Sequence, residues 1–211
     1  MAAIEVGVFG GAFDPPHLGH VELARAGIEH FALDRLLVRV VEDPGHKEVS
    51  TPPATRLRLA ELSFEPLLGV AVELDPFART VDSLEALAVP DPVFLLGADE
   101  FVSFPNWKEP ARVLALARLG VATRPGVERE RLEAVTAGLD RPDRVTFFPI
   151  EPLPVSSSAI RARVAARQSI DGLVPAAVAA EIEVLELYRR IETAGDGGML
   201  EEEPSERTSP T

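Results

Sequence analysis

Cysteine is absent from this 211-residue chain, which also has only one tryptophan and one tyrosine. Without cysteine the chain forms no disulfide, no thiolate metal site and no thiol nucleophile. Long hydrophobic runs are missing too: no stretch reaches the roughly 18 apolar residues of a membrane span. The N-terminal MAAIEV lacks the charged region and cleavage site of a signal peptide. We therefore expect a cytoplasmic protein without a membrane partner.

Positive charge is scarce, with 21 Lys and Arg against 34 Asp and Glu and a net charge of −13. A general nucleic-acid binder needs a basic surface to face the phosphate backbone, so we predict no nucleic-acid partner. A small phosphorylated ligand is not excluded, because it needs only a few local positive groups and oriented backbone amides.

Predicted strands and helices alternate along the chain. Short, β-branched apolar runs predict six strands, at Ile4–Phe9, Leu36–Val41, Val70–Leu74, Val93–Leu96, Leu119–Ala122 and Arg144–Phe148. Helical spacing of apolar residues predicts helices at Leu18–Phe31, Ala54–Leu68, Val81–Ala88, Pro110–Ala117, Val127–Leu139, Ser156–Arg167 and Ala176–Arg190. In the second helix, Arg56, Arg58 and Glu61 fall largely off the apolar side. The alternation predicts an α/β fold: a Rossmann-like, doubly wound, mainly parallel sheet with helices on both faces. Ligands of such folds bind at the carboxyl ends of the strands, near the switch point.

One domain accounts for most of the chain. With 46% hydrophobic residues, 1–193 suits a single core. The Gly-, Glu- and Ser-rich stretch 194–211 predicts a disordered tail. A Pro- and Gly-rich loop, Glu42–Pro53, carries His46 and Lys47 and is long enough to form a mobile flap.

The segment GGAFDPPHLGH joins the first strand to the first helix. Gly10 and Gly11 expose backbone amides at the mouth of a helix, where the helix dipole favours an anion. His17 and His20, three residues apart, fall on one helical face and can offer positive groups to phosphate oxygens. Gly19 between them allows a ligand to approach closely. Two alternatives stay open at this point: surface histidines beside a turn, and a zinc pair that lacks a nearby third ligand.

The segment VSSSAIR begins a later helix. Its hydroxyls predict an N-cap with free amides and with phosphate-binding hydroxyls at Ser157 and Ser158. Arg161, a few residues into the helix, can swing back as a cationic clamp. On its own this segment is equally well explained as a helix cap.

Two single residues have both a structural and a functional interpretation. Asp99 is expected at the end of a buried strand, where its carboxylate caps the next turn or serves a nucleotide or its magnesium. Trp107 follows a Phe-Pro-Asn turn, where its ring covers the edge of the core or stacks on a pyridine ring.

The first segment closely resembles the G-G-x-F-D-P-x-H-x-G-H signature of the nucleotidylyltransferase superfamily, whose members transfer a nucleoside monophosphate from ATP or CTP. The second resembles the I-S-S-T-x-I-R signature of the same superfamily. Further segments resemble its bacterial nicotinate-mononucleotide adenylyltransferases: His46-Lys47, Arg79–Leu84, Gly97–Asp99, Phe104–Lys108, Thr123–Gly126 and the LVPAAV that precedes a terminal Leu-Tyr. The chain departs from that pattern near the acceptor side, with Pro76–Arg79 in place of Gly-Pro-Ser-Tyr and Gly45 in place of the proline before His-Lys.

The resemblance implies transfer of AMP from ATP to nicotinate mononucleotide, which gives deamido-NAD and pyrophosphate. It implies four catalytic residues: His17, His20, Lys47 and Arg161. It implies an ATP site formed by Gly10, Gly11, Phe13, His17, His20, Gly97, Asp99, Ser157, Ser158 and Arg161. It implies an acceptor site formed by Asp14, Lys47, Thr80, Trp107 and Arg124. Mg²⁺ enters with ATP, and no side chain is assigned to it.

Alternatives to this function remain. The altered Pro76–Arg79 segment leaves room for a sister transferase that uses nicotinamide mononucleotide or phosphopantetheine. A non-catalytic nucleotide-binding module would lack a signature histidine or Arg161, and the chain keeps all three. The sequence does not decide between a monomer and a homo-oligomer.

Overall fold

A computed structural model describes residues 4–45, 49, 51–123 and 129–189. Six strands form one sheet in the order β3-β2-β1-β4-β5-β6, and each neighbouring pair is parallel. The strands are β1 (Val6–Gly11), β2 (Arg35–Val41), β3 (Val70–Asp75), β4 (Val93–Gly97), β5 (Arg118–Thr123) and β6 (Val145–Pro149). This confirms the predicted Rossmann-like, doubly wound fold.

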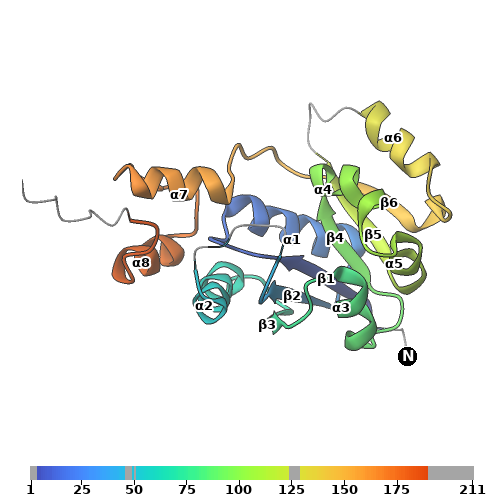
Figure 1. Ribbon diagram of the computed structural model, residues 1–211, viewed down its shortest axis with the longest axis horizontal. Helices are drawn as coiled ribbons and strands as arrows, with labels where there is room; N and C mark the ends of the chain where they lie inside the picture. Colours follow the sequence, from blue (N-terminus) through green and yellow to red (C-terminus); the bar gives the residue numbers. More distant parts are fainter. Residues whose placement is uncertain (1–3, 46–48, 50, 124–128, 190–211) are drawn as a thin grey trace, which may run out of the picture.

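Helices follow the strands in alternation and lie on both sides of the sheet (Figure 1). They are α1 (Leu18–Phe31), α2 (Pro53–Phe64), α3 (Thr80–Leu87), α4 (Ala98–Ser103), α5 (Pro110–Leu116), α6 (Arg129–Ala137), α7 (Ser157–Ala165) and α8 (Ala176–Val184), with short 3-10 turns at Phe104–Asn106 and Pro142–Arg144. No helix in the described ranges is both long and apolar enough to cross a bilayer.

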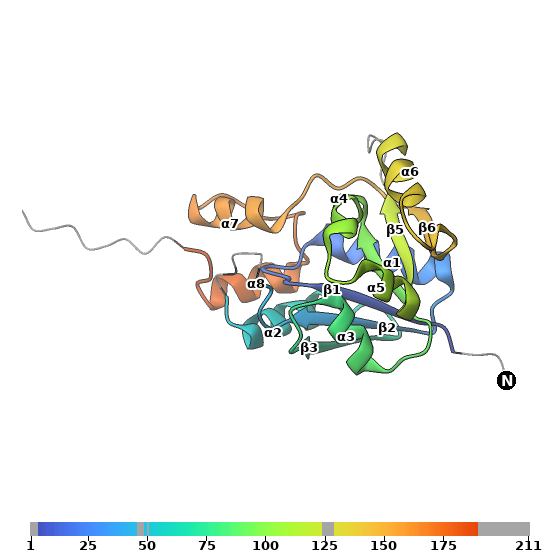
Figure 2. The same ribbon diagram turned by 45° about the vertical axis from the view of Figure 1, so that its right-hand side comes forward.

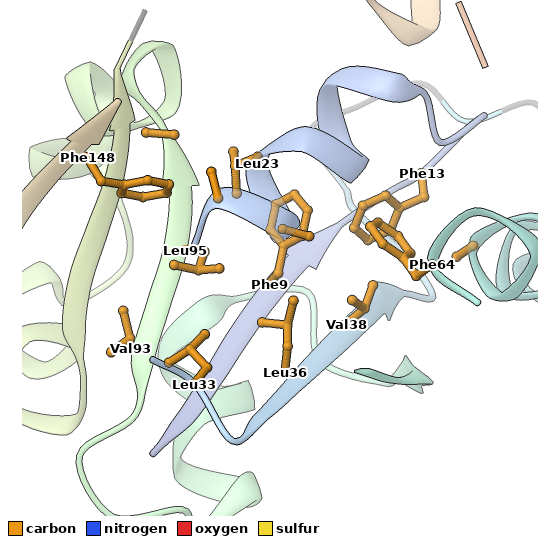
Figure 3. Packing of buried hydrophobic residues seen from close by; sticks show 14 of the residues in the cluster. Phe9, Phe13, Leu23, Leu33, Leu36, Val38, Phe64, Val93, Leu95 and Phe148 are labelled. Atoms are coloured by element: carbon orange, nitrogen blue, oxygen red, sulfur yellow. The ribbon is translucent and has the colours of Figure 1, made fainter. Parts of the chain in front are cut away.

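Apolar side chains fill both faces of the sheet, because successive residues of a strand point to opposite sides. On one face, Phe9 and Leu95 pack with Leu23 of α1 and Phe64 of α2 (Figure 3). On the other face, the adjacent strand residues pack against α3, α4, α5 and α6. The long apolar runs of the strands therefore reflect burial on both sides.

A third hydrophobic cluster joins α2 to the C-terminal helices. Leu59 of α2, Ile160 of α7, and Val178 and Ile182 of α8 are buried together. In both views α7 and α8 lie at the opposite end of the molecule from α5 and α6 (Figures 1 and 2). Helices α7 and α8 are thus packed on the side of the sheet that carries α2.

Strand order reverses between β1 and β4, which lie side by side although they are far apart in the sequence. The chain leaves β1 toward β2 on one side and leaves β4 toward β5 on the other. A crevice forms outside the carboxyl ends of the strands at such a switch point. Gly11 and Gly97 are the last residues of these two strands.

Several element bounds differ from the prediction; the first strand, for example, spans Val6–Gly11 instead of Ile4–Phe9. Helix α4 was not predicted, because six residues are too few to show helical periodicity. Helix α2 ends at Phe64, since Pro66 cannot donate the next helical hydrogen bond. Helix α8 ends at Val184, and a turn follows in which Glu186 and Tyr188 have left-handed backbone angles. The predicted tail, 194–211, lies outside the described residues.

Candidate active site

A cavity of about 1050 Å³ opens at the carboxyl ends of β1 and β4. Its walls come from the β1–α1 loop, the start of α7, the β3–α3 turn and the segment from α4 to Lys108. It is lined by the predicted site residues Gly10, Gly11, Phe13, Asp14, His17, His20, Thr80, Gly97, Asp99, Trp107, Ser157, Ser158 and Arg161. Two further predicted residues, Lys47 and Arg124, lie outside the described residues.

The two signature histidines lie at the first turn of α1. His17 is the N-cap residue, and its backbone N–H donates to Nδ1 of His20 at 3.2 Å. Their rings stack with centroids 3.7 Å apart and planes 22° apart. Because Nδ1 of His20 accepts a hydrogen bond, the proton of the neutral ring is carried by Nε2.

Aromatic side chains hold the His20 ring from behind. The buried ring of Phe13 packs edge-on against His20, with centroids 5.1 Å apart, and also contacts Phe9 and Phe64. Gly11 permits this arrangement, because a Cβ there would lie 2.9 Å from the Phe13 ring. Since that ring belongs to the core, the contact with ATP predicted for Phe13 would have to use its backbone.

His17 is neutral at physiological pH. Burial lowers the pKa of His17 to about 4, so the ring is an uncharged donor and acceptor. This differs from the expectation that both imidazoles offer positive charge. Nδ1 of His17 is buried and has no hydrogen-bond partner in the described part of the chain. A Cβ on Gly19 would lie 3.1 Å from this atom, so Gly19 makes room for the His17 ring.

The second signature segment touches the first directly. Ser157 Oγ donates to the Pro15 carbonyl at 2.8 Å, and Arg161 Nη1 donates to the Asp14 carbonyl at 2.7 Å. These contacts join residues 142 and 147 positions apart in the sequence. The two signatures therefore form one continuous wall of the cavity.

The start of α7 presents further polar groups. Ser156 caps the helix by accepting from the Ala159 N–H at 3.2 Å, and its Oγ lies 3.1 Å from that of the exposed Ser158. On the opposite wall, Asp99 stands in the first turn of α4 and is exposed. The expectation that Asp99 ends a buried strand is wrong, because the strand stops at Gly97 and α4 begins at once.

Asp14 is fixed by a residue from the far end of the chain. Its carboxylate is only 2% exposed and accepts from Tyr188 Oη at 2.7 Å. Burial, with the hydrogen bond to Asp14 adding to it, raises the pKa of Tyr188 above its ordinary value, so the phenol stays protonated and donates. Tyr188 was not predicted as a site residue. Its only signal in the sequence was the family-like Leu-Tyr ending.

Trp107 lines the side of the cavity opposite the histidines, and its ring also packs on the core. It is half-buried and meets Phe94 and Phe104 edge to face, with centroids 6.1 and 5.4 Å apart. Its Nε1 donates to Ser103 Oγ at 3.2 Å. The packing interpretation of this tryptophan is therefore confirmed, and its stacking on a pyridine ring stays a prediction. Thr80, at the start of α3, lines the same side.

An ionic network that was not predicted lines this side of the cavity. Arg39, in the middle of β2, donates to Glu73 at 2.7 Å and to the buried Asp75 at 3.1 Å. Asp75 also accepts from the Ser83 hydroxyl of α3. The signal in the sequence was the single charge within the run LLVRVV. Asp75 directly precedes the altered segment Pro76–Arg79 and accepts from the Phe77 N–H at 3.1 Å, and Ser83 lies in the helix that follows the segment.

Comparison with known proteins identifies the family. The cytidylyltransferase-like family model matches residues 8–163, which include both signature segments. A protein of Thermomicrobium roseum named probable nicotinate-nucleotide adenylyltransferase is 37% identical over 199 residues, which cover 89% of this chain and 92% of that protein. A protein of the same name from Rubrobacter xylanophilus is 32% identical over 216 residues, which cover 96% of this chain and 100% of that protein. This chain belongs to the nicotinate-nucleotide adenylyltransferases, within the cytidylyltransferase-like family.

The fold of these adenylyltransferases is found in solved structures as well. Plasmodium falciparum nicotinic acid mononucleotide adenylyltransferase complexed with APC superposes with a TM-score of 0.70 at 14% identity, over 88% of this chain and 98% of that one. Its complex with NaAD gives a TM-score of 0.71 at 16% identity over the same shares. At this identity the likeness concerns the fold alone.

Proposed function

We propose that this chain transfers AMP from ATP to nicotinate mononucleotide, giving deamido-NAD and pyrophosphate. The observation that carries the proposal is the cavity at the switch point. One wall unites the stacked histidines with Arg161 of α7, and the opposite side presents Trp107. The names of the relatives, and the complex of a structural neighbour with NaAD, support the same reaction.

The reaction needs positioning and charge stabilisation more than a protein nucleophile. A phosphate oxygen of the mononucleotide attacks the α-phosphorus of ATP and forms the new P–O bond. The bond from the α-phosphorus to the bridging oxygen breaks, and pyrophosphate leaves with that electron pair.

Each group of residues in the cavity wall has a role in this proposal. The Nε2–H of His20 and the neutral His17 donate to the α-phosphoryl group and the leaving pyrophosphate, where negative charge grows. The N-terminal amides of α7, the Ser158 hydroxyl and Arg161 hold the remaining phosphate oxygens. Ser157 contributes through its backbone amide, because its hydroxyl donates to the Pro15 carbonyl. By resemblance to the family, Lys47 also binds the triphosphate.

The acceptor lies on the other side of the cavity in this proposal. The exposed part of the Trp107 ring stacks on the pyridine ring, while Phe94 and Phe104 keep the indole in place. Thr80 faces the rest of the mononucleotide from this side, and Arg124 joins it by resemblance. Asp14, which the resemblance also assigns to the acceptor, borders the mononucleotide from the histidine wall.

Mg²⁺ enters with ATP in this proposal. The described residues contain no group of three or more His, Cys, Asp or Glu able to hold a metal, but Asp99 lines the cavity. Mg²⁺ commonly binds through substrate phosphates and one or two carboxylates, so this donor set fits an ion carried by the triphosphate. When bound, the ion neutralises phosphate charge.

A second candidate is a sister transferase with another phosphorylated acceptor. It is favoured by one observation: the Arg39–Asp75 network holds a segment, Pro76–Arg79, that differs from the family pattern at the acceptor side. Nicotinamide mononucleotide and phosphopantetheine are the acceptors to compare.

The test is a pyrophosphate-release assay with ATP and Mg²⁺ against nicotinate mononucleotide, nicotinamide mononucleotide, phosphopantetheine and no acceptor. We expect the highest kcat/KM with nicotinate mononucleotide, and deamido-NAD as the product by mass spectrometry. Turnover with phosphopantetheine but not with nicotinate mononucleotide would contradict the proposal. A preference for nicotinamide mononucleotide would favour the second candidate.

A further inference from the structure

Arg56 of α2 was predicted to lie off the apolar face, but its side chain is 0% exposed. Its guanidinium donates to four backbone carbonyls. Nη1 reaches Ala12 and Val41, both at 2.8 Å, Nη2 reaches Glu42 at 2.7 Å, and Nε reaches Thr51 at 3.0 Å. One side chain therefore binds three separate segments of the chain.

The partners of this guanidinium are unusual. A fully buried arginine is rare and is normally paired with a carboxylate. Here the acceptors are carbonyls at or just beyond the ends of β1 and β2 and just before the start of α2. Such buried carbonyls need partners, and a planar guanidinium with five N–H groups can serve several at once. Burial lowers the pKa of Arg56, while the nearby charge of Asp14 opposes that shift.

The carbonyl of Ala12 links Arg56 to the candidate active site. Ala12 stands between Gly11 and Phe13, and the Phe13 ring supports His20. Two residues further on, the Asp14 carbonyl receives Arg161. A shift of Ala12 would therefore displace both the His20 ring and the Arg161 guanidinium in the cavity wall. Arg56 itself does not line the cavity, so it acts on a ligand only through these residues.

We propose that Arg56 is a positioning residue for ATP. By tying Ala12 to the ends of the β2–α2 connection, it keeps the backbone of the β1–α1 loop and the His20 ring in the geometry that the triphosphate requires. The inference rests on the proposed function for its kinetic readout. Lysine cannot replace arginine here, because one ammonium cannot span carbonyls on opposite sides of a planar fork.

The test compares Arg56→Lys and Arg56→Gln with Arg58→Lys. Arg58 is a matched control on the same helix, since its side chain is 54% exposed and its carboxylate partners are 3.9 Å away. We expect Arg56→Lys to raise KM for ATP about 10-fold or more, since small misplacements of binding groups cost up to about 10²-fold in rate. KM for nicotinate mononucleotide should change far less. Arg58→Lys should match the wild type in both constants.

A purely structural role would give a different result. If Arg56→Lys only reduced the folded fraction, kcat would fall while both KM values stayed unchanged, and that result would overturn the proposal. Loss of the cooperative thermal transition in both Arg56 variants, with Arg58→Lys intact, would overturn it as well.

Hydrogen exchange separates this inference from the proposed function. In Arg56→Lys the amides of residues 11–14 should exchange faster than in the wild type, whereas those of β5 should not change. Unchanged exchange in the loop would contradict the positioning role whatever the substrate. If exchange in the loop is faster in Arg56→Lys but the wild-type protein shows no turnover, the positioning role stands and only the proposed function is contradicted.

Discussion

His17 enters the site as a neutral ring, and this follows from where the chain places it. It caps α1 between the stacked His20 ring and the bare backbone of Gly19, and burial there disfavours the imidazolium. A neutral imidazole has one N–H to donate and one nitrogen that accepts. His17 can therefore approach ATP without first releasing a proton at neutral pH.

The lowered pKa of His17 also makes stability depend on pH. The pKa falls from 6.5 in the unfolded chain to about 4 in the fold. Between these values the unfolded state binds a proton that the folded state does not. The stabilisation is therefore complete above pH 6.5 and is lost as the pH falls toward 4. We expect this one group to cost about 2 kcal/mol of unfolding free energy between about pH 7 and pH 5.

Urea unfolding of the wild type and His17→Gln at these two pH values measures that contribution. The loss of stability on acidification should be smaller in the variant by the stated amount. An equal loss in both proteins would show that the His17 pKa is not lowered.

Single residues were predicted unevenly. The histidines and Arg161 were found because they belong to dense local patterns. Arg56 was misplaced because a charged residue is usually exposed, and because its partners are carbonyls, which have no signature in a sequence. Tyr188 was missed for a different reason: its partner, the Asp14 carboxylate, is 174 residues away in the sequence.

Among the structural elements, the segment between α4 and α5 places one side chain both against the core and at the cavity. Trp107 lies directly after the 3-10 turn Phe104–Asn106 and contacts Phe94 of β4. Its indole is therefore held by the turn and the strand while it also lines the cavity.

This arrangement predicts an unequal effect of Trp107→Ala on the two substrates. Loss of ring stacking should raise KM for nicotinate mononucleotide by about 10-fold or more and KM for ATP much less. Steady-state kinetics with each substrate varied in turn provides the measurement. Trp107→Phe is the control, because it keeps an aromatic face. Equal increases in both KM values would restrict Trp107 to packing.

The strands were predicted nearly in full, because a parallel sheet buried on both faces requires continuous apolar runs. Boundaries were less accurate where tertiary contacts decide them. The end of α8 is fixed by a turn in which the Leu187 N–H donates to the Ile182 carbonyl. Helix α4 depends on its place between β4 and the Phe104 turn, and no periodicity indicates it.

Across the whole molecule, the sheet order brings distant segments together. The reversal between β1 and β4 opens the crevice, and the cluster of α2, α7 and α8 places Ser157 and Arg161 against the β1–α1 loop. Sequence spacing alone does not predict this contact, because it depends on how the C-terminal helices pack. The resemblance implied that the two signatures meet, and the structure gives the hydrogen bonds by which they do.

In the proposed reaction, His20 and Arg161 act on the same triphosphate. The decisive measurement is kcat, at saturating ATP and nicotinate mononucleotide, for the wild type, His20→Ala, Arg161→Ala and the double variant. We predict that each single substitution lowers kcat by about 10²- to 10³-fold while the thermal transition persists. The double variant should lose less than the product of the two, since residues that act as a unit are not additive. A folded His20→Ala variant with unchanged kcat, or losses that multiply in full, would contradict the account.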